Sequence, residues 1–193
     1  MKQQSSYRIA LTALFAALSY AVFTFLQIKI PVGADMTSIH LGNAVVVLAA
    51  LVIGGPLGGL AGALGMSIGD FFDPVYLPLV PKTFLCKLLI GLITGFLAHR
   101  VGRIGHSDDR SHILRWVILS VSLGLLFNVI ADPIIGYFYK ILILGKPAAD
   151  VSLRINFLAS GINAVVSAIV STIIYMSLYP VLRKQSLTLT PER

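Results

Sequence analysis

Four side chains that carry charge or form strong hydrogen bonds lie inside apolar stretches of this sequence: Lys87, Asp132, Asn156 and Asn163. The chain around them is 56% hydrophobic and has a mean hydropathy of +0.88, which is typical of a membrane protein. An ionisable or amide group inside a bilayer is costly unless it faces a partner or a water-filled cavity. Polar groups on several separate segments therefore predict a small polar pocket within a bundle of membrane helices.

The depth of these groups supports one shared pocket. At a rise of about 1.5 Å per residue, Lys87 lies about 9 Å and Asp132 about 13 Å below the outer ends of their predicted helices. Asn156 and Asn163 are seven residues apart, so they share one helix face, at depths of roughly 5 and 15 Å. Asn128 and Asp132, four residues apart, also share a face. All five groups map to the outer half of the membrane, which predicts an outward-facing cavity for a small polar molecule.

Residues near the ends of the predicted loops complete the candidate site. His40 and Asn43 flank the start of one apolar segment, and Tyr76 lies in a Pro-containing loop that would cap the cavity. His40 lacks a second His, Cys or carboxylate at ligand spacing, so we predict no metal site. The predicted substrate-binding set is His40, Asn43, Tyr76, Lys87, Asn128, Asp132, Asn156 and Asn163.

A structural interpretation of the same residues stands beside the functional one. Lys87 and Asp132 can neutralise each other as an ion pair, which would still be able to line the cavity. Asn163 can instead form a structural hydrogen bond to a neighbouring helix. Three further cations near segment ends are interpreted as anchors that extend to the membrane surface, namely Lys82, Lys140 and Arg154.

The elements that position these residues follow from composition and length. Only 12% of the residues are charged, against about a quarter in a soluble domain. A spanning helix needs roughly 20 apolar residues, so the chain has room for about six. We predict an all-α integral membrane protein with one domain, residues 1–193, and helices at about 7–28, 41–53, 57–71, 83–97, 116–144 and 155–182.

The connections between these helices differ in character. The segments 41–53 and 57–71 are short and are joined by Gly54-Gly55-Pro56, so tilt or local thinning must accommodate them. Residues 29–40 and 70–82 are predicted to be long ordered loops. The stretch 99–115 is hydrophilic, and its scattered histidines are expected in solvent without a metal role: His99, His106 and His112.

The distribution of basic residues sets the predicted orientation. With six crossings, nine of the 15 Lys and Arg residues fall on the side of the termini and six on the other side. An excess of basic residues marks the cytoplasmic side, so both termini are predicted to be cytoplasmic. The net charge of +7 is therefore attributed to membrane topology, and no nucleic-acid partner is expected.

A row of small residues on the first helix predicts a docking surface. Ala13, Ala17 and Ala21 recur at every fourth position, and such a row lets another helix approach closely. Glycines in the second and third segments repeat at the same spacing, Gly58-Gly62 and Gly65-Gly69. Packing within the bundle and docking of a partner membrane protein are both consistent with these rows.

Signatures of enzymes are missing from the sequence. It contains no G-x-S-x-G or H-E-x-x-H motif, and no paired catalytic carboxylates are evident. The glycines at 54–59 lack the Lys-Ser/Thr continuation of a P-loop. We therefore predict a binding protein without a cofactor of its own, in which any use of ATP belongs to another polypeptide.

Several segments together resemble the substrate-binding S components of energy-coupling factor (ECF) vitamin transporters. The resemblance covers the first four helices, whereas the last two match in length and topology only. The segments that carry it are Ala13-x-x-x-Ala17, IHLGNA at 39–44, LAALVIGGPLGGLAG at 48–62, Gly69-Asp70, and Pro81 with Lys87 and Gly91.

This resemblance implies a multi-pass subunit of the bacterial plasma membrane that captures a vitamin from outside. It would dock through Ala13 and Ala17 onto a transmembrane coupling subunit that carries two cytoplasmic ATPases, and ATP use by those partners would reset the complex. Such subunits are thought to topple in the membrane to deliver the occupied cavity. The loop 29–40 would act as the gate.

The vitamin itself is left open by the sequence. A small polar pocket with few aromatic residues favours a single-ring compound, hydroxymethylpyrimidine or pyridoxine, and the pattern is similar to the subgroup for these ligands and riboflavin. Lys87 could instead meet a carboxylate, which keeps pantothenate and niacin open.

Two other classes of protein compete with the S component. An autonomous proton- or cation-coupled carrier would use Asp132, with Asp132-Pro133 breaking the fifth helix; the lack of a second, inverted copy of the fold counts against it. A membrane scaffold without transport would explain the small residues but leave the polar groups without a role.

Overall fold

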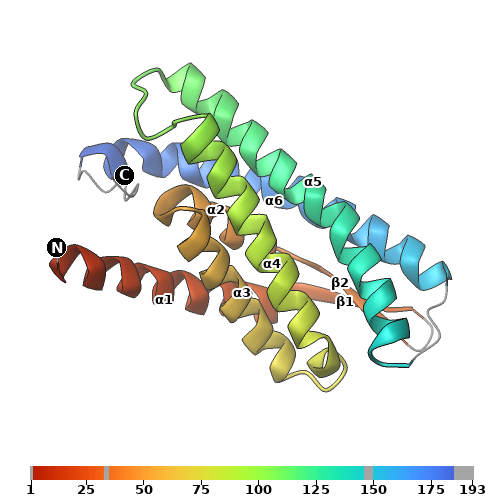
Figure 1. Cartoon of the computed structure of the whole chain (residues 1–193). Helices are drawn as coiled ribbons and strands as arrows, with labels where there is room; N and C mark the ends of the chain where they lie inside the picture. Colours follow the sequence, from red (N-terminus) through yellow and green to blue (C-terminus); the bar gives the residue numbers. More distant parts are fainter. Residues whose placement is uncertain (1, 33–34, 146–149, 185–193) are drawn as a thin grey trace.

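The computed structural model describes residues 2–32, 35–145 and 150–184 of the chain. Six α-helices make up most of this part (Figure 1). They are α1 (Lys2–Phe25), α2 (Gly42–Ile53), α3 (Gly55–Phe71), α4 (Val80–Gly95), α5 (Arg110–Leu142) and α6 (Asp150–Lys184). A short 3-10 helix, Leu77–Leu79, precedes α4, and a π-helix, Phe96–Val101, follows it.

The prediction of an all-α fold is wrong in one segment. Residues expected to form a long loop are instead a β-hairpin, in which β1 (Gln27–Val32) pairs antiparallel with β2 (Asp35–His40). The first helix accordingly ends at Phe25 rather than at residue 28. Backbone groups near a membrane must be paired within the protein where water is scarce, and the hairpin provides this pairing.

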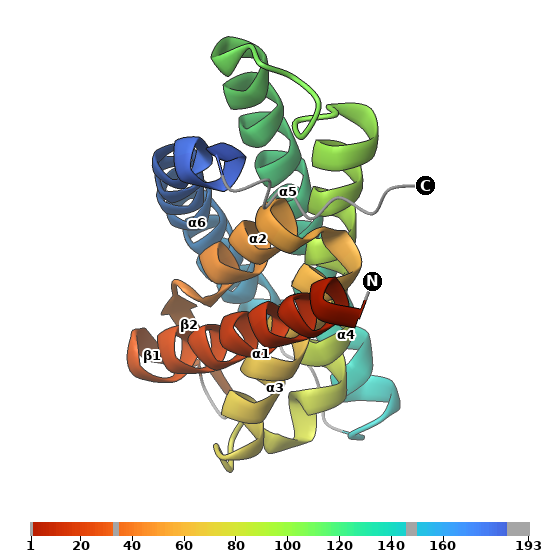
Figure 2. The same cartoon turned by 90° about the vertical axis from the view of Figure 1, so that its left-hand side faces the viewer.

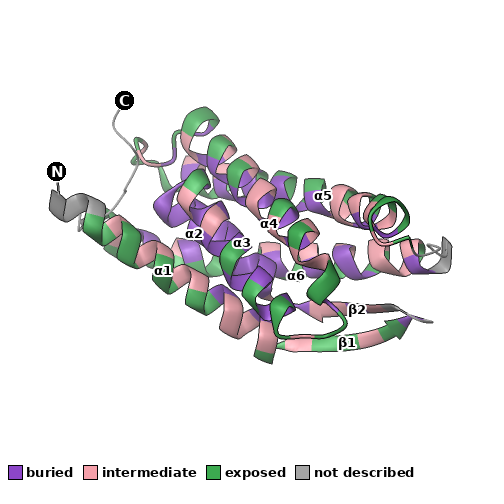
Figure 3. Ribbon diagram, turned by 60° about the horizontal axis from the view of Figure 1, so that its bottom comes forward, coloured by how far each residue is buried: buried purple, intermediate pink, exposed green. Residues whose placement is uncertain are grey.

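The short helix α2 forms the centre of the bundle. All twelve of its residues are buried, and it contacts each of the five other helices. Figure 2 shows α2 enclosed by its neighbours, and Figure 3 shows it as a continuously buried element. Because every face of α2 meets protein, its sequence is a near-uniform run of Val, Ala, Leu and Ile without an amphipathic pattern.

Glycines allow α3 to pack very closely against α2 and α4. A Cβ atom added to Gly91 would lie 2.2 Å from Cα of Gly59, and one added to Gly95 would lie 2.2 Å from Cα of Gly55. A Cβ on Gly58 would lie 2.3 Å from the backbone nitrogen of Ala50 in α2. These glycines therefore serve packing inside the bundle, one of the two interpretations that the sequence left open.

The turn between α2 and α3 requires glycine for a different reason. Gly54 has a φ of +89°, a region that residues with a side chain rarely adopt. Pro56 then lies at the start of α3, where the missing N–H of proline costs nothing. The predicted Gly-Gly-Pro junction between two short helices is confirmed.

The helix α5 runs without a break through Pro133. The predicted interruption at Asp132-Pro133 is therefore wrong. Membrane helices tolerate proline because neighbouring helices and side chains can satisfy the freed backbone carbonyl. The helix break that would have favoured a cation-coupled carrier is therefore not found in α5 as the structure describes it.

The hydrophilic stretch after α4 is shorter than predicted. The start of α5 lies at Arg110, capped by Asp109, whose carboxylate accepts a hydrogen bond from the N–H of Ser111 at 2.8 Å. His99 is half-buried and lies 3.1 Å from the carbonyl oxygen of Ala50, and His112 lies 2.8 Å from that of Gly102. The expectation of solvated histidines fails for these two, which bind the π-helix segment to the bundle.

Among the described residues, four helical segments are long and apolar enough to cross a membrane: Ser6–Phe25, Leu77–Val101, Arg110–Leu142 and Ser152–Arg183. In the views of Figures 1 and 3, the beginning of α1, the α4–α5 connection and the end of α6 lie at one end of the bundle. The hairpin lies toward the other end. Which end faces the cytoplasm stays a prediction from the basic residues.

The glycine contact between α3 and α4 can be tested with a matched pair of substitutions. Gly91→Ala should lower stability by about 1–3 kcal/mol, because its methyl group would overlap the backbone of α3. Gly161→Ala is the control, since an added Cβ there meets nothing within 4 Å. Thermal unfolding in detergent measures both, and equal melting temperatures for Gly91→Ala and the wild type would contradict this packing account.

Candidate functional site

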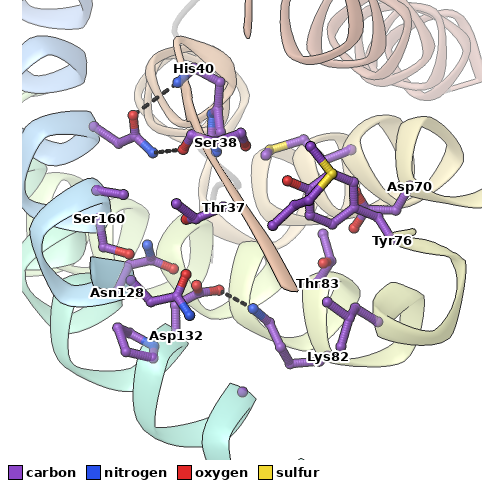
Figure 4. A pocket seen from close by; sticks show the side chains of 18 of the residues that line it. Thr37, Ser38, His40, Asp70, Tyr76, Lys82, Thr83, Asn128, Asp132 and Ser160 are labelled. Atoms are coloured by element: carbon purple, nitrogen blue, oxygen red, sulfur yellow. Dashed lines mark hydrogen bonds and ion pairs between the residues drawn. The ribbon is translucent and has the colours of Figure 1, made fainter. Parts of the chain in front are cut away.

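A polar cavity lies between the hairpin and the helix bundle (Figure 4). Its walls come from β2 and from all six helices, together with the Tyr76 turn. The structure brings all eight residues of the predicted substrate-binding set to this one cavity: His40, Asn43, Tyr76, Lys87, Asn128, Asp132, Asn156 and Asn163. Whether they contact a ligand stays a prediction.

The size of the cavity limits what it can hold. Its volume is about 100 Å³, measured as the space open to the centre of a water molecule. A single water needs about 10–15 Å³ on this measure, so the cavity has room for a small molecule and not only for one ordered water.

An ionic cluster joins α4 to α5 at the cavity wall. The Lys82 ammonium lies 3.0 Å from Oδ1 of Asp132, and the Lys87 ammonium lies 4.0 Å from the same oxygen. The expected Lys87–Asp132 contact is therefore present, but it is longer than the contact between Lys82 and the same carboxylate. The expectation that Lys82 is an anchor at the membrane surface is wrong, because Lys82 turns inward and binds Asp132 (Figure 4).

A side-chain amide binds the hairpin to α6. Oδ1 of Asn163 accepts a hydrogen bond from the backbone N–H of His40 at 2.9 Å, and Nδ2 of Asn163 donates to the carbonyl oxygen of Ser38 at 3.0 Å. The amide thus pairs with β2 as a neighbouring strand would. The His40 ring also packs edge-on against Phe23 of α1, with ring centroids 4.9 Å apart.

A second contact binds the hairpin on its other side. The ammonium of Lys29 in β1 forms an ion pair with Asp73, and it lies 5.9 Å from the ring centroid of Tyr76. Although partial burial favours the neutral acid, hydrogen bonds from Lys29 and from the N–H of Val75 hold the pKa of Asp73 below its usual value. The Asp73 carboxylate is therefore available as the anionic partner of Lys29.

The cavity combines a cationic wall with neutral acceptors. Burial, and then the charge of Lys87, lower the pKa of His40 from 6.5 to about 3, so His40 is neutral at physiological pH. Partial burial raises the pKa of Tyr76 to about 12, which keeps its hydroxyl protonated. The oxygens Oδ1 of Asn43 and Asn128 are buried and have no partner within the described part of the protein.

Several lining residues were missed by the sequence analysis. Lys140, interpreted as a surface anchor, is buried and lines the cavity, whereas Arg154 is exposed as that interpretation requires. The other missed polar residues are Thr37, Ser38, Asp70, Thr83, Tyr137, Ser152 and Ser160. Hydroxyl groups are common in membrane helices and carry little signal alone. Asp70 and Lys82, opposite charges at the two ends of one predicted loop, are the signal that could have been used.

The predicted docking residues lie outside this cavity. On α1, Ala13 and Ala17 are exposed and Ala21 is half-buried. The same helix uses its other face to pack on α3, where a Cβ on Gly65 would lie 2.2 Å from the carbonyl oxygen of Ala16. The alanine row is therefore open on the surface, and its role as a docking site stays a prediction.

Comparison with known proteins gives two matches. Residues 3–180 match the family described as ECF-type riboflavin transporter, S component. The solved structure of ThiT from Listeria monocytogenes is similar with a TM-score of 0.66 and 18% sequence identity, covering 96% of this chain and 99% of that one. At this identity the likeness shows the fold alone. No curated protein sequence matches the chain.

The role of Asn163 in holding the hairpin can be measured. Asn163→Ala removes both hydrogen bonds to β2, at a cost of about 1–2 kcal/mol, so amide exchange in residues 27–40 should be roughly 5–30 times faster. Asn156→Ala is the matched control, because Nδ2 of Asn156 bonds within α6, to Ser152 at 3.4 Å. Mass spectrometry measures the amide exchange. If the hairpin exchanges equally slowly in both variants, Asn163 does not hold it.

Proposed function

This chain belongs to the family of ECF-type riboflavin transporter S components, and from that membership we propose that it captures a small water-soluble vitamin or vitamin precursor outside the cell. S components are multi-pass proteins of the plasma membrane that bind and transport, and they are not enzymes. The observation that supports capture most strongly is the polar cavity, on which polar residues from α2, α4, α5 and α6 converge.

The proposed delivery step requires partners. We infer that α1 docks on a transmembrane coupling subunit associated with two cytoplasmic ATPases, which use the ATP. The exposed Ala13 and Ala17 support this, because small side chains let a second helix approach closely in lipid. The hairpin, held by Asn163 and by the Lys29–Asp73 ion pair, would be the gate that releases the vitamin.

The polar lining of the cavity bears on the choice among vitamins. A cavity of about 100 Å³ lined mostly by polar side chains supports a small polar ligand, and we favour the single-ring compounds hydroxymethylpyrimidine and pyridoxine. Pantothenate, niacin and riboflavin are the alternatives.

A carrier that couples uptake to a proton or cation at Asp132 is the alternative function. Asp132 already binds Lys82 at 3.0 Å and has Lys87 at 4.0 Å, so it lacks the free carboxylate that a cation site would use. The continuous α5 helix removes the other feature that favoured this function.

Docking and binding can be separated by two tryptophan substitutions on α1. Ala13→Trp with Ala17→Trp should abolish uptake of the vitamin by cells that contain the coupling subunit and its ATPases, because the bulky rings keep the partner helix away. Binding of the vitamin by the purified variant should be unchanged. Ile169→Trp on α6, also at an exposed position, is the control and should transport normally. Normal uptake by the double variant would remove α1 from the mechanism.

A further inference from the structure

The two strands of the hairpin have different neighbours. In Figure 3, β2 lies on the side of α6 and β1 lies on the outer side. The hairpin residues that line the cavity all belong to β2: Met36, Thr37, Ser38 and His40. Among the described residues of β1, none lines the cavity. The strand β2 therefore covers the cavity, while β1 connects this cover to the turn that follows α3.

The attachment of β2 is buried and is made to its backbone. Asn163 is only 4% exposed, and its amide bonds both the N–H of His40 and the carbonyl oxygen of Ser38. These two backbone groups lie on one edge of β2, the edge away from β1. Breaking such a bond leaves a buried backbone group unpaired, which shifts an equilibrium by about 5- to 150-fold per group. The α6 side of the hairpin is therefore firmly held.

The attachment of β1 is made by side chains that water can reach. The ammonium of Lys29 pairs with Asp73 and lies 5.9 Å from the ring centroid of Tyr76. The side chain of Lys29 is 40% exposed. An exposed ion pair or cation–π contact shifts an equilibrium by only about 1.5- to 5-fold, and salt screens the ion pair. The β1 side of the hairpin is therefore the weaker of the two.

The turn 73–76 holds both partners of Lys29 in place. The N–H of Tyr76 donates to the carbonyl oxygen of Asp73 at 3.0 Å, and Oδ1 of Asp73 accepts from the N–H of Val75 at 3.0 Å. Tyr76 lies between Lys29 and the cavity, because it contacts the ammonium and also lines the cavity wall. Separation of Lys29 from this turn would therefore open a path at Tyr76 that leads into the cavity.

We propose that the hairpin opens along its β1 edge. It turns on the attachment of β2 to Asn163, while Lys29 separates from the turn 73–76, and the entrance to the cavity lies between β1 and that turn. This inference rests on the proposed role of the hairpin as a gate and deepens it, because it assigns the side that stays attached and the path of the ligand. Lys29 and Asp73 are positioning residues in this step, since they act through the hairpin rather than on the ligand.

Access to the cavity can be measured without a ligand. Cys86 is the single cysteine of the chain, so Cys86→Ala gives a background without thiols. Ser160 in α6 lines the cavity and is 8% exposed, and Ser160→Cys therefore places one thiol behind the hairpin. The rate at which the uncharged reagent methyl methanethiosulfonate modifies this thiol reports opening in detergent-purified protein. Lys29→Met should raise the rate roughly 3- to 25-fold, because it removes both contacts of the ammonium.

Further variants identify the ion pair as the cause. Asp73→Asn keeps an oxygen for the N–H of Val75 but removes the charge, so it should also raise the rate. Adding Asp73→Asn to Lys29→Met should give no further increase, because the two residues act as one pair. Lys29→Arg should keep the slow rate. High salt should raise the rate of the parent protein and leave that of Lys29→Met unchanged. Arg154→Gln removes an exposed cation from α6 and is the control, which should match the parent in rate and salt response.

Amide exchange tests the other side of the hairpin and needs no introduced cysteine. The N–H of His40 donates to Asn163, so its exchange reports the attachment of β2. Exchange at His40 should be as slow in Lys29→Met as in the wild type, and it should be faster in Asn163→Ala. Faster exchange at His40 in Lys29→Met would show that the hairpin leaves α6 as a whole, which would overturn the proposal.

The access measurement can overturn the proposal independently. A modification rate that is the same in Lys29→Met and in the parent would show that the cavity is entered from another side. Equal acceleration by Arg154→Gln would assign the effect to general surface charge. Neither measurement uses a vitamin, so either failure leaves the vitamin-capture function standing, and a protein that binds no vitamin would still show which edge of the hairpin opens.

Discussion

The structure depends on one constraint: a charge within lipid must find its partner inside the protein, since lipid offers none. Lys82, Asp132 and Lys87 meet this constraint by joining α4 to α5 at the cavity wall. They can do so only if lipid is excluded around them. The close α3–α4 packing at Gly59 and Gly91, together with the fully buried α2, provides that exclusion. Packing by small residues and charge at the site are thus two parts of one arrangement.

The same constraint explains the hairpin. Without a cover, the polar groups of the cavity would be open at the membrane surface and their arrangement would not be specific. The hairpin closes this side and is attached at two edges by different chemistry, an amide of α6 and an ion pair to the turn after α3. Few contacts of moderate strength would suit the gate proposed for this hairpin, which has to open as well as close.

Much of the site was predictable because the cost of burying a polar group in lipid is visible in the sequence. Asp132, Asn163 and Lys87 stood out against apolar neighbours, and all lie on the one cavity. Lys82 did not, because a lysine near a helix end is usually an anchor, and only tertiary contacts show that it turns inward. The hairpin was missed although its two strands are adjacent in the sequence, because Pro31, Gly33 and Asp35 are residue types that are depleted in strands and common in loops. The break expected at Pro133 does not occur, and α5 continues through it.

The cavity is proposed to be a binding site for a small vitamin-like molecule and not a structural polar cluster. Native mass spectrometry of the protein purified alone from cells grown in vitamin-rich medium tests it most directly. A binding site should retain one small molecule per chain, whose mass identifies the vitamin, and loss of that molecule on mild activation should return the mass of the bare chain. A protein that is empty, and that stays empty after incubation with the vitamins, would contradict the claim.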